Sequence, residues 1–272
     1  MVYELKARTE LGKKVLAGEI TSIEQIFSTG QKIREPWIVD KLLPNLKSEV
    51  LFFGGSPGKG GGITRTSTRR TARMHRSGRR YKISALVAVG SLGYVGLGKA
   101  TSNEHSIAIS KATDAAKLNI IPIKLGCGSW ECRCKQGHSI PVVASGKRGS
   151  VFIKLFPAPT GVGLCIADEG KKIVRLAGIR DIWSQTEGQS RTRYNYAWAL
   201  YDALKSMNRM KLDLPDVKAP VELAGEEKRE KDETAELEAK ELEEIAAELA
   251  EKPKKEDVIA RPELEGGVEV EE

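Results

Sequence analysis

The chain has 272 residues and a formal net charge of +7, an average that conceals two oppositely charged parts. Residues 213–272 carry 9 basic and 22 acidic side chains, whereas residues 1–212 carry 35 and 15. The excess of basic over acidic side chains in residues 1–212 is typical of a protein that neutralises nucleic-acid phosphates. No stretch approaches the roughly 18 apolar residues of a membrane span, and the four cysteines do not suggest a disulfide-stapled secreted domain. We expect a soluble cytoplasmic protein with no membrane partner.

Residues 1–48 are expected to form a helical N-terminal extension. Apolar spacing and capping residues predict three short helices, one over residues 5–16, one that begins at Thr21 or Ser22, and one over residues 38–43. Pro36 is expected to interrupt the pattern. The extension is too small and too loosely patterned to predict an independent domain.

Residues 49–120 follow a pattern typical of a mixed α+β unit. The predicted elements are a glycine-rich loop over residues 54–62, strands over 63–76 and 79–90 joined around Ser77-Gly78, a strand over 94–100, and a helix over 104–118. Asn103 is the expected cap of that helix. Its expected buried stripe comprises Ile107, Ala108, Lys111, Ala112, Ala115 and Leu118.

Residues 121–212 predict a second α+β unit, followed by an acidic tail over residues 213–272. Strands are expected over residues 121–125, 139–143, 151–156 and 179–183, and helices over residues 168–177 and 191–207. Gly178 is the expected stop of the first helix, and the second should bury Ala197, Leu200, Tyr201 and Leu204. The tail has little to bury, so we expect it to be mobile. Its role as a shield of the basic part or as a solubilising segment stays open.

The strongest functional signal is that no Asp or Glu occurs between Glu49 and Glu104. An ordinary solvated surface mixes both signs, so this window favours phosphate binding, and its arginines suit phosphate geometry. On one continuous strand, Arg65, Arg69 and Arg73 would share a face. A basic sheet surface without a recognition helix favours RNA over DNA. The predicted RNA-binding residues are Arg65, Arg69, Arg70, Arg73, Arg76, Arg79, Arg80 and Lys82, with Lys99, Lys147, Arg148, Arg191 and Arg193 as secondary candidates.

A glycine-rich segment from Gly93 to Lys99 has the G-x-x-x-x-G-K spacing of a phosphate-binding loop, which raises a nucleotide hydrolase as the rival hypothesis. Ala100 stands where that loop needs Ser or Thr for Mg²⁺, and residues 94–97 have strand character. The alternative is a tight hairpin whose glycines let the backbone approach RNA closely. No Ser–His–Asp or paired-carboxylate arrangement is evident, so we do not expect an enzyme.

A cluster of potential metal ligands follows the first unit. Cys127, Cys132, Cys134 and His138 lie within a dozen residues and could close a tetrahedral zinc site. The Cys-x-Cys spacing is less usual than Cys-x₂-Cys, so a metal-free loop of reduced thiols is an equal alternative. A redox role is weaker, because the redox motif is Cys-x-x-Cys. Cys165 lies apart in an apolar setting that is typical of a core residue.

Four separated motifs, in order, resemble the family of ribosomal protein five of the small subunit. They are residues 78–81 (GRRY), 93–100 (GYVGLGKA), 157–164 (PAPTGVGL) and 177–183 (AGIRDIW). The N-terminal segment resembles the extension of archaeal and eukaryotic members, and the cysteine version of the loop resembles archaeal ones. Ser91-Leu92 stands where the family usually has Asp or Asn in a turn.

The resemblance implies a double-stranded-RNA-binding-like domain at about residues 49–120, followed by a βαβ domain with a left-handed crossover. It also implies a structural constituent of the small ribosomal subunit that binds small-subunit rRNA. Further implied are contacts with small-subunit proteins four and eight, a place beside the mRNA entry channel, and support of subunit assembly and decoding accuracy.

Overall fold

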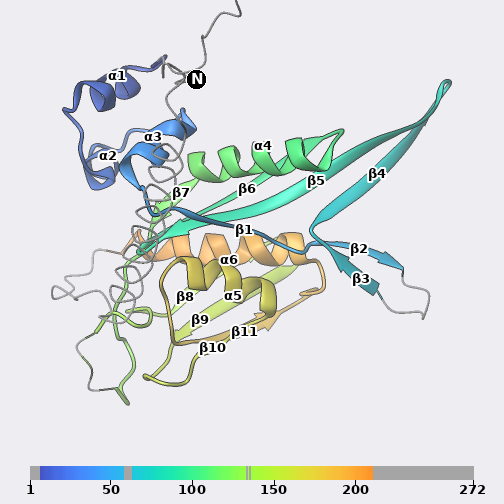
Figure 1. The fold of residues 1–272 in the computed structure, drawn as a ribbon. Coiled ribbons are helices and arrows are strands. Elements are labelled where there is room, and N and C mark those ends of the chain that lie inside the picture. The colour runs from blue at the N-terminus through green and yellow to red at the C-terminus, as the bar shows by residue number, and fades with distance from the viewer. Residues whose placement is uncertain (1–6, 58–62, 133, 135, 211–272) are drawn as a thin grey trace, which may run out of the picture. The chain divides into compact units, whose positions relative to one another are not determined.

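The computed structural model describes residues 7–57, 63–132, 134 and 136–210. The expected acidic tail, residues 213–272, lies outside the described residues. In the described residues three helices are followed by six strands, and the other helices and strands are interspersed after them (Figure 1). None of the helices in the described ranges is long and apolar enough to cross a membrane.

Three short helices form the N-terminal extension: α1 (Glu10–Ala17), α2 (Ile23–Thr29) and α3 (Pro36–Leu42). Their apolar side chains share a small core, which Ile120 from the following unit joins. Pro36 was expected to interrupt the helical pattern, but it begins α3 instead. Proline is well suited to this first position, because the backbone N–H it lacks would have no partner inside the helix.

The first sheet has the strand order β1-β5-β6-β7, with β4 paired to the outer part of β5. Its strands are β1 (Lys47–Val50), β4 (Thr68–His75), β5 (Gly78–Ser91), β6 (Tyr94–Ser102) and β7 (Ile120–Pro122). A separate antiparallel pair joins β2 (Gly54–Pro57) to β3 (Ile63–Thr66). Leu92-Gly93 forms the turn between β5 and β6, and Gly93 supplies its positive φ of 78°.

Helix α4 (His105–Leu118) covers one face of this sheet (Figure 1). It buries Ala108, Ala112 and Ala116, whereas Ile107 and Leu118 of the expected stripe are exposed. The small alanines let the helix lie close to β6, where a Cβ on Gly96 or Gly98 would meet the backbone of Ala116. These glycines therefore serve helix packing, and the expectation that they bring the backbone close to RNA is wrong.

The second sheet has the order β10-β11-β9-β8. Its strands are β8 (Ala144–Arg148), β9 (Val151–Pro157), β10 (Leu164–Cys165) and β11 (Ile182–Glu187). The β10–β11 pair is parallel and the others are antiparallel. Between β10 and β11 the chain forms α5 (Asp168–Leu176), and α6 (Arg193–Met207) follows the sheet.

A common hydrophobic core joins the two sheets. Leu86 and Ala88 of β5 belong to the same cluster as Ile153 and Leu155 of β9. Helix α5 contacts β5 and α6 contacts β8 and β9, so the two helices fill the space between the sheets (Figure 1). The first sheet is thus held on both faces, which gives its long strand β5 a rigid base.

Several predicted elements are confirmed, and several are wrong in detail. The strands over 79–90, 94–100 and 151–156 and the helices over 104–118, 168–177 and 191–207 are confirmed to within a few residues. The expected strand over 63–76 breaks at Ser67, and half of the expected glycine loop is strand β2. The strand expected at 121–125 is β7 of the first sheet, residues 139–143 form only one bridge, and the strand expected at 179–183 begins at Ile182.

Candidate RNA interface and metal centre

Strands β4 and β5 form a long hairpin that projects beyond the end of α4 (Figure 1). Its tip is the two-residue loop Arg76-Ser77, and Gly78 adopts the positive φ of 103° that the turn requires. Every residue from Arg69 to Lys82 is exposed, so this part of the hairpin has no core of its own. Its side chains are therefore free to bind a partner.

The strand register sorts the side chains of the hairpin onto two faces. Directly paired residues share a face, and successive residues alternate. One face, which we call the basic face, carries Arg69, Thr71, Arg73 and His75 of β4 with Arg80 and Lys82 of β5. The other, which we call the aromatic face, carries Arg70, Ala72 and Met74 of β4 with Arg79 and Tyr81 of β5.

The charge of this hairpin is uncompensated within the described part of the chain. None of the ion pairs found there involves Arg69, Arg70, Arg73, Arg76, Arg79, Arg80 or Lys82. Like charges held close together raise the local positive potential, which attracts phosphate groups and releases counterions when they bind. The hairpin therefore has the electrostatics of a polyanion-binding surface.

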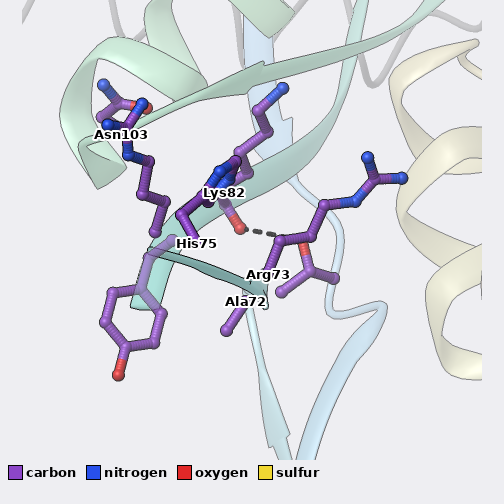
Figure 2. A pocket seen from close by; sticks show the side chains of 8 residues that line it. Ala72, Arg73, His75, Lys82 and Asn103 are labelled. Carbon is purple, nitrogen blue, oxygen red and sulfur yellow. Dashed lines mark hydrogen bonds between the residues drawn. The ribbon is translucent and has the colours of Figure 1, made fainter. Parts of the chain in front are cut away.

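A hollow of about 890 Å³ lies along the hairpin, and Figure 2 shows the side chains that surround it. The Thr71 hydroxyl donates a hydrogen bond of 3.2 Å to the carbonyl oxygen of Lys82, which ties the two strands together there. Asn103, from the turn between β6 and α4, reaches the same hollow. The lining residues are Thr71, Ala72, Arg73, His75, Arg80, Tyr81, Lys82 and Asn103.

The remaining predicted RNA-binding residues have different surroundings. Arg65 lies on β3, a different strand from Arg69 and Arg73, so the expectation of one continuous arginine row is wrong. Lys99 is exposed, and its Nζ lies 4.4 Å from the centroid of the Tyr194 ring. Lys147 is also exposed.

Two arginines are already engaged within the protein. Arg148 is 3.6 Å from the Asp202 carboxylate and lies over the Trp198 ring. Arg193 pairs with the buried Glu169 at 2.9 Å, so it holds α6 to α5.

The nucleotide-hydrolase hypothesis is wrong. Residues 94–99 lie in β6, paired with β5 on one side, and residues 94–96 pair with β7 on the other. Because their backbone groups are engaged in the sheet, they cannot form the open loop of N–H groups that cradles a phosphate.

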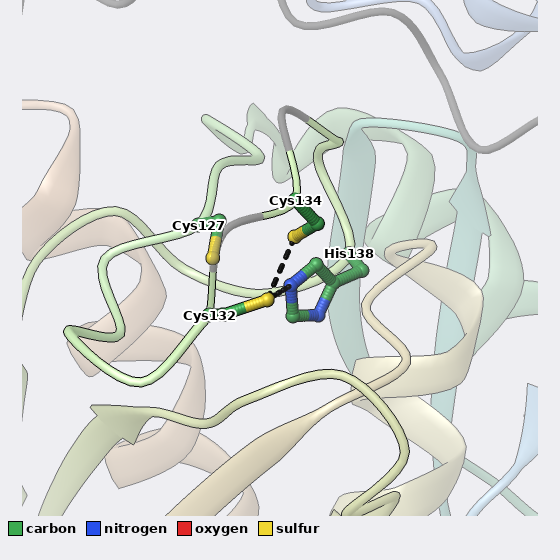
Figure 3. A group of neighbouring side chains, drawn as sticks. All are labelled: Cys127, Cys132, Cys134 and His138. Carbon is green, nitrogen blue, oxygen red and sulfur yellow. Dashed lines mark hydrogen bonds between the residues drawn. The ribbon is translucent and has the colours of Figure 1, made fainter.

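The three cysteines and His138 come together in the loop that precedes β8 (Figure 3). Their ligand atoms all lie within 4.8 Å of one another. The Cys132 Sγ is 2.9 Å from the Cys134 Sγ and 3.6 Å from the His138 Nε2. Zinc–ligand bonds of about 2.0–2.3 Å place tetrahedral ligands roughly 3.5–3.8 Å apart, so the donor set fits zinc after small shifts.

Asp181 holds His138 from behind, and sequence patterns gave no sign of this contact. Its Oδ2 lies 2.8 Å from the His138 Nδ1, and both side chains are buried. A carboxylate only accepts, so the Nδ1 carries the proton and the Nε2 lone pair faces the thiols. The Oδ1 accepts from the backbone N–H groups of Gly161 and Gly163, at 3.1 and 2.8 Å.

Two thiols of this group have pKa values shifted in opposite directions. Hydrogen bonding with the Cys134 thiol and the Thr160 hydroxyl lowers the pKa of Cys132 to about 5. Burial, reinforced by hydrogen bonding with Cys134, raises the pKa of Cys127 to about 12. The cluster therefore stabilises one thiolate at neutral pH, and thiolate is the form that binds metal.

Models of known protein families match the segments of the chain that form most of the two sheets. Residues 66–124 match the family model of the ribosomal protein S5 N-terminal domain, and residues 146–218 match that of the S5 C-terminal domain. Similar proteins include small ribosomal subunit protein uS5 of Methanothermobacter thermautotrophicus, 46% identical over 79% of this chain and 93% of that protein. The uS5 protein of Thermofilum pendens is 48% identical over 75% of this chain and 95% of that protein.

The fold, the exposed basic hairpin and these matches define a structural RNA-binding protein. The chain belongs to the ribosomal protein S5 family, as a non-enzymatic constituent of the small subunit of the cytoplasmic ribosome. The resemblance found in four sequence motifs is thereby confirmed.

Proposed function

We propose that the β4–β5 hairpin is a principal contact of this chain with small-subunit rRNA, made mainly through phosphates. The observation that carries this proposal is the exposure of seven basic side chains, between Arg69 and Lys82, without an acidic neighbour. Arginine forks bind phosphate oxygens in pairs. Lys99 extends the surface, because it pairs with Leu86 on the face that continues from Arg80 and Lys82. Arg65, Lys147 and Arg148 provide further contacts.

Replacing Arg69 and Arg70 with alanine is expected to weaken RNA binding whatever the RNA sequence. Each lost phosphate contact removes about one released counterion, so the slope of log affinity against log salt should fall by about two. Filter binding of the full chain to small-subunit rRNA over a series of KCl concentrations measures this slope. The paired variant Lys13→Ala/Lys14→Ala, on α1, is the control. An unchanged slope in the arginine variant would mean that the contact surface lies elsewhere.

We propose that residues 49–120 form a double-stranded-RNA-binding-like domain and residues 121–212 a βαβ domain with a left-handed crossover. The first is supported by α4, which lies on an antiparallel sheet. The second is supported by the parallel strands β10 and β11, which precede and follow α5 along the chain. Residues 1–48 are proposed as an extension that packs onto the first of these domains, which the position of Ile120 in its core supports. Residues 213–272 are proposed as a separate acidic tail.

In the subunit, we propose contacts with small-subunit proteins four and eight and a position beside the mRNA entry channel. There the chain would support subunit assembly and decoding accuracy. Family membership supports these placements. Cross-linking of purified subunits followed by mass spectrometry tests them, and cross-links exclusively to other proteins would contradict them.

We also propose that Cys127, Cys132, Cys134 and His138 hold one structural zinc ion. The convergence of four donors and the carboxylate behind His138 support this role. A bound ion would complete four coordination positions with protein ligands, so it would brace the loop and would leave no open position for catalysis.

Purified protein is expected to contain one zinc ion per chain, and Cys132→Ser to contain none. Serine keeps the size of the side chain but replaces the thiolate by a poor zinc ligand. Metal analysis together with native mass spectrometry measures the stoichiometry. Cys165→Ser, at a cysteine outside the cluster, is the matched control and should retain the metal. Metal-free wild-type protein that folds normally in zinc-supplemented buffer would instead favour a loop of reduced thiols.

A further inference from the structure

The aromatic face of the hairpin carries groups that phosphate binding does not need. Tyr81 is 39% exposed and Met74 is 71% exposed, and neither side chain packs into a hydrophobic core. Ala72 stands directly opposite Tyr81 and is small, so it leaves space around the ring. On a solvated ribbon such an aromatic and thioether pair adds little to the stability of the hairpin, so a partner is the better account of it.

Arg70 is stacked on this ring. Its guanidinium carbon lies over the Tyr81 ring, 3.6 Å from the ring centroid, which is a close cation–π contact. Arg70 pairs with Ile83 and Tyr81 with Ala72, so the two stacked residues are diagonal neighbours across the strands. The stack holds the guanidinium plane in place before any ligand arrives, which lowers the entropy lost on binding.

From this arrangement we propose that the aromatic face is a subsite for an unpaired nucleobase of the rRNA. The base extends the stack formed by Tyr81 and Arg70, and Met74 contacts its edge or its sugar. The basic face meanwhile binds the phosphates. This inference rests on the proposed function, and it adds base stacking on the aromatic face to the phosphate contacts of the hairpin.

The composition of this face favours RNA over an apolar protein partner. The centre of a protein–protein interface is depleted of charged residues, whereas Arg70 and Arg79 stand beside Tyr81 and Met74. Aromatic rings and guanidinium planes together are the groups on which unpaired bases stack. A paired base could not reach the face, because its own neighbours in the helix cover both of its surfaces.

Stacking and phosphate contacts leave different signatures in salt titrations. Replacing Tyr81 with leucine should lower affinity for small-subunit rRNA about tenfold and leave the salt slope unchanged, because no counterion is involved. Tyr81→Phe keeps the ring and should bind like the wild type. Arg70→Lys keeps the charge but loses the plane, so it should also lower affinity without a change in slope. Binding of the full chain to protein-free rRNA is measured at several KCl concentrations.

The Arg73→Ala variant, on the basic face, separates this proposal from the phosphate contact. For this variant the slope of log affinity against log salt should fall by about one. If the slope falls but Tyr81→Leu binds like the wild type, base stacking is overturned and the phosphate contact stands. If the slope does not change in Arg73→Ala, the phosphate contact fails independently of stacking.

Photo-cross-linking adds a readout of direct contact. Ultraviolet illumination of the wild-type complex should give a nucleotide adduct on the peptide that contains Tyr81, and mass spectrometry identifies it. Because the hairpin has no core, the variants should unfold at the same urea concentration as the wild type, which shows that a loss of affinity is not a loss of fold. Adducts on the neighbouring peptides but none on Tyr81 would contradict the proposal.

Discussion

Replacing Gly98 with alanine is expected to destabilise the protein more than any other single added methyl group on the first sheet. A Cβ at this position would meet the backbone of Ala112 and Ala116 and would lie 2.7 Å from the carbonyl carbon of Ala115. Backbone atoms in the middle of a helix cannot turn aside as a side chain can, so α4 must move away from β6. We expect a loss of about 3 kcal/mol in the free energy of unfolding.

Urea unfolding of the full chain measures this loss, and Gly78→Ala is the matched control. Gly78 has a φ of 103° but no atom within 4 Å of its would-be Cβ, so alanine there should cost only about 1–2 kcal/mol of backbone strain. A loss at Gly98 no larger than that at Gly78 would show that α4 lies less tightly on the sheet than the structure indicates.

The same glycines show where the sequence alone was ambiguous. Gly93 to Lys99 has the spacing of a phosphate-binding loop, yet glycines at this spacing also arise where a strand passes close under a helix. The two situations differ in whether the segment pairs with neighbouring strands, which is a long-range property. The local signs of the second were the absence of a hydroxyl at Ala100 and the strand character of residues 94–97.

Elements that bury one side were predictable, and exposed elements were not. The alternation of Val151, Ile153 and Leu155 and the helical spacing over 193–207 both encode a buried face, so pattern alone placed them. The break at Ser67 lies in a segment that is mostly exposed on both faces. No periodic pattern of apolar residues marks where β3 ends and β4 begins. The row of Arg65, Arg69 and Arg73 was therefore wrongly predicted, although the structure shows all three residues exposed.

The metal ligands and their support also differ in how far the sequence reveals them. Cys127, Cys132, Cys134 and His138 lie close together along the chain, so their types and spacing suffice to identify the cluster. Asp181 is 43 residues beyond His138, and its carboxylate is placed there only because the fold brings the backbone N–H groups of Arg180 and Asp181 to the His138 carbonyl oxygen. Contacts of this kind depend on the whole fold.

Asp181→Ala is expected to cost about 3–5 kcal/mol in the free energy of unfolding. The change leaves the buried His138 Nδ1–H without its acceptor, and the N–H groups of Gly161 and Gly163, which are nearer to solvent, lose theirs as well. It also frees the His138 ring to rotate, so zinc affinity should fall about 10–100-fold. Urea unfolding measures the first effect, and competition with a chelator measures the second.

Asp202→Ala is the matched control, because it also removes a carboxylate that pairs with a basic side chain. The Asp202–Arg148 pair is partly exposed and 3.6 Å long, so its loss should cost less than about 1 kcal/mol and leave zinc affinity unchanged. Equal destabilisation by the two changes would mean that Asp181 contributes no more than a surface charge. A large loss of stability with unchanged zinc affinity would separate its two roles, because the carboxylate would then hold the glycine turn without orienting His138.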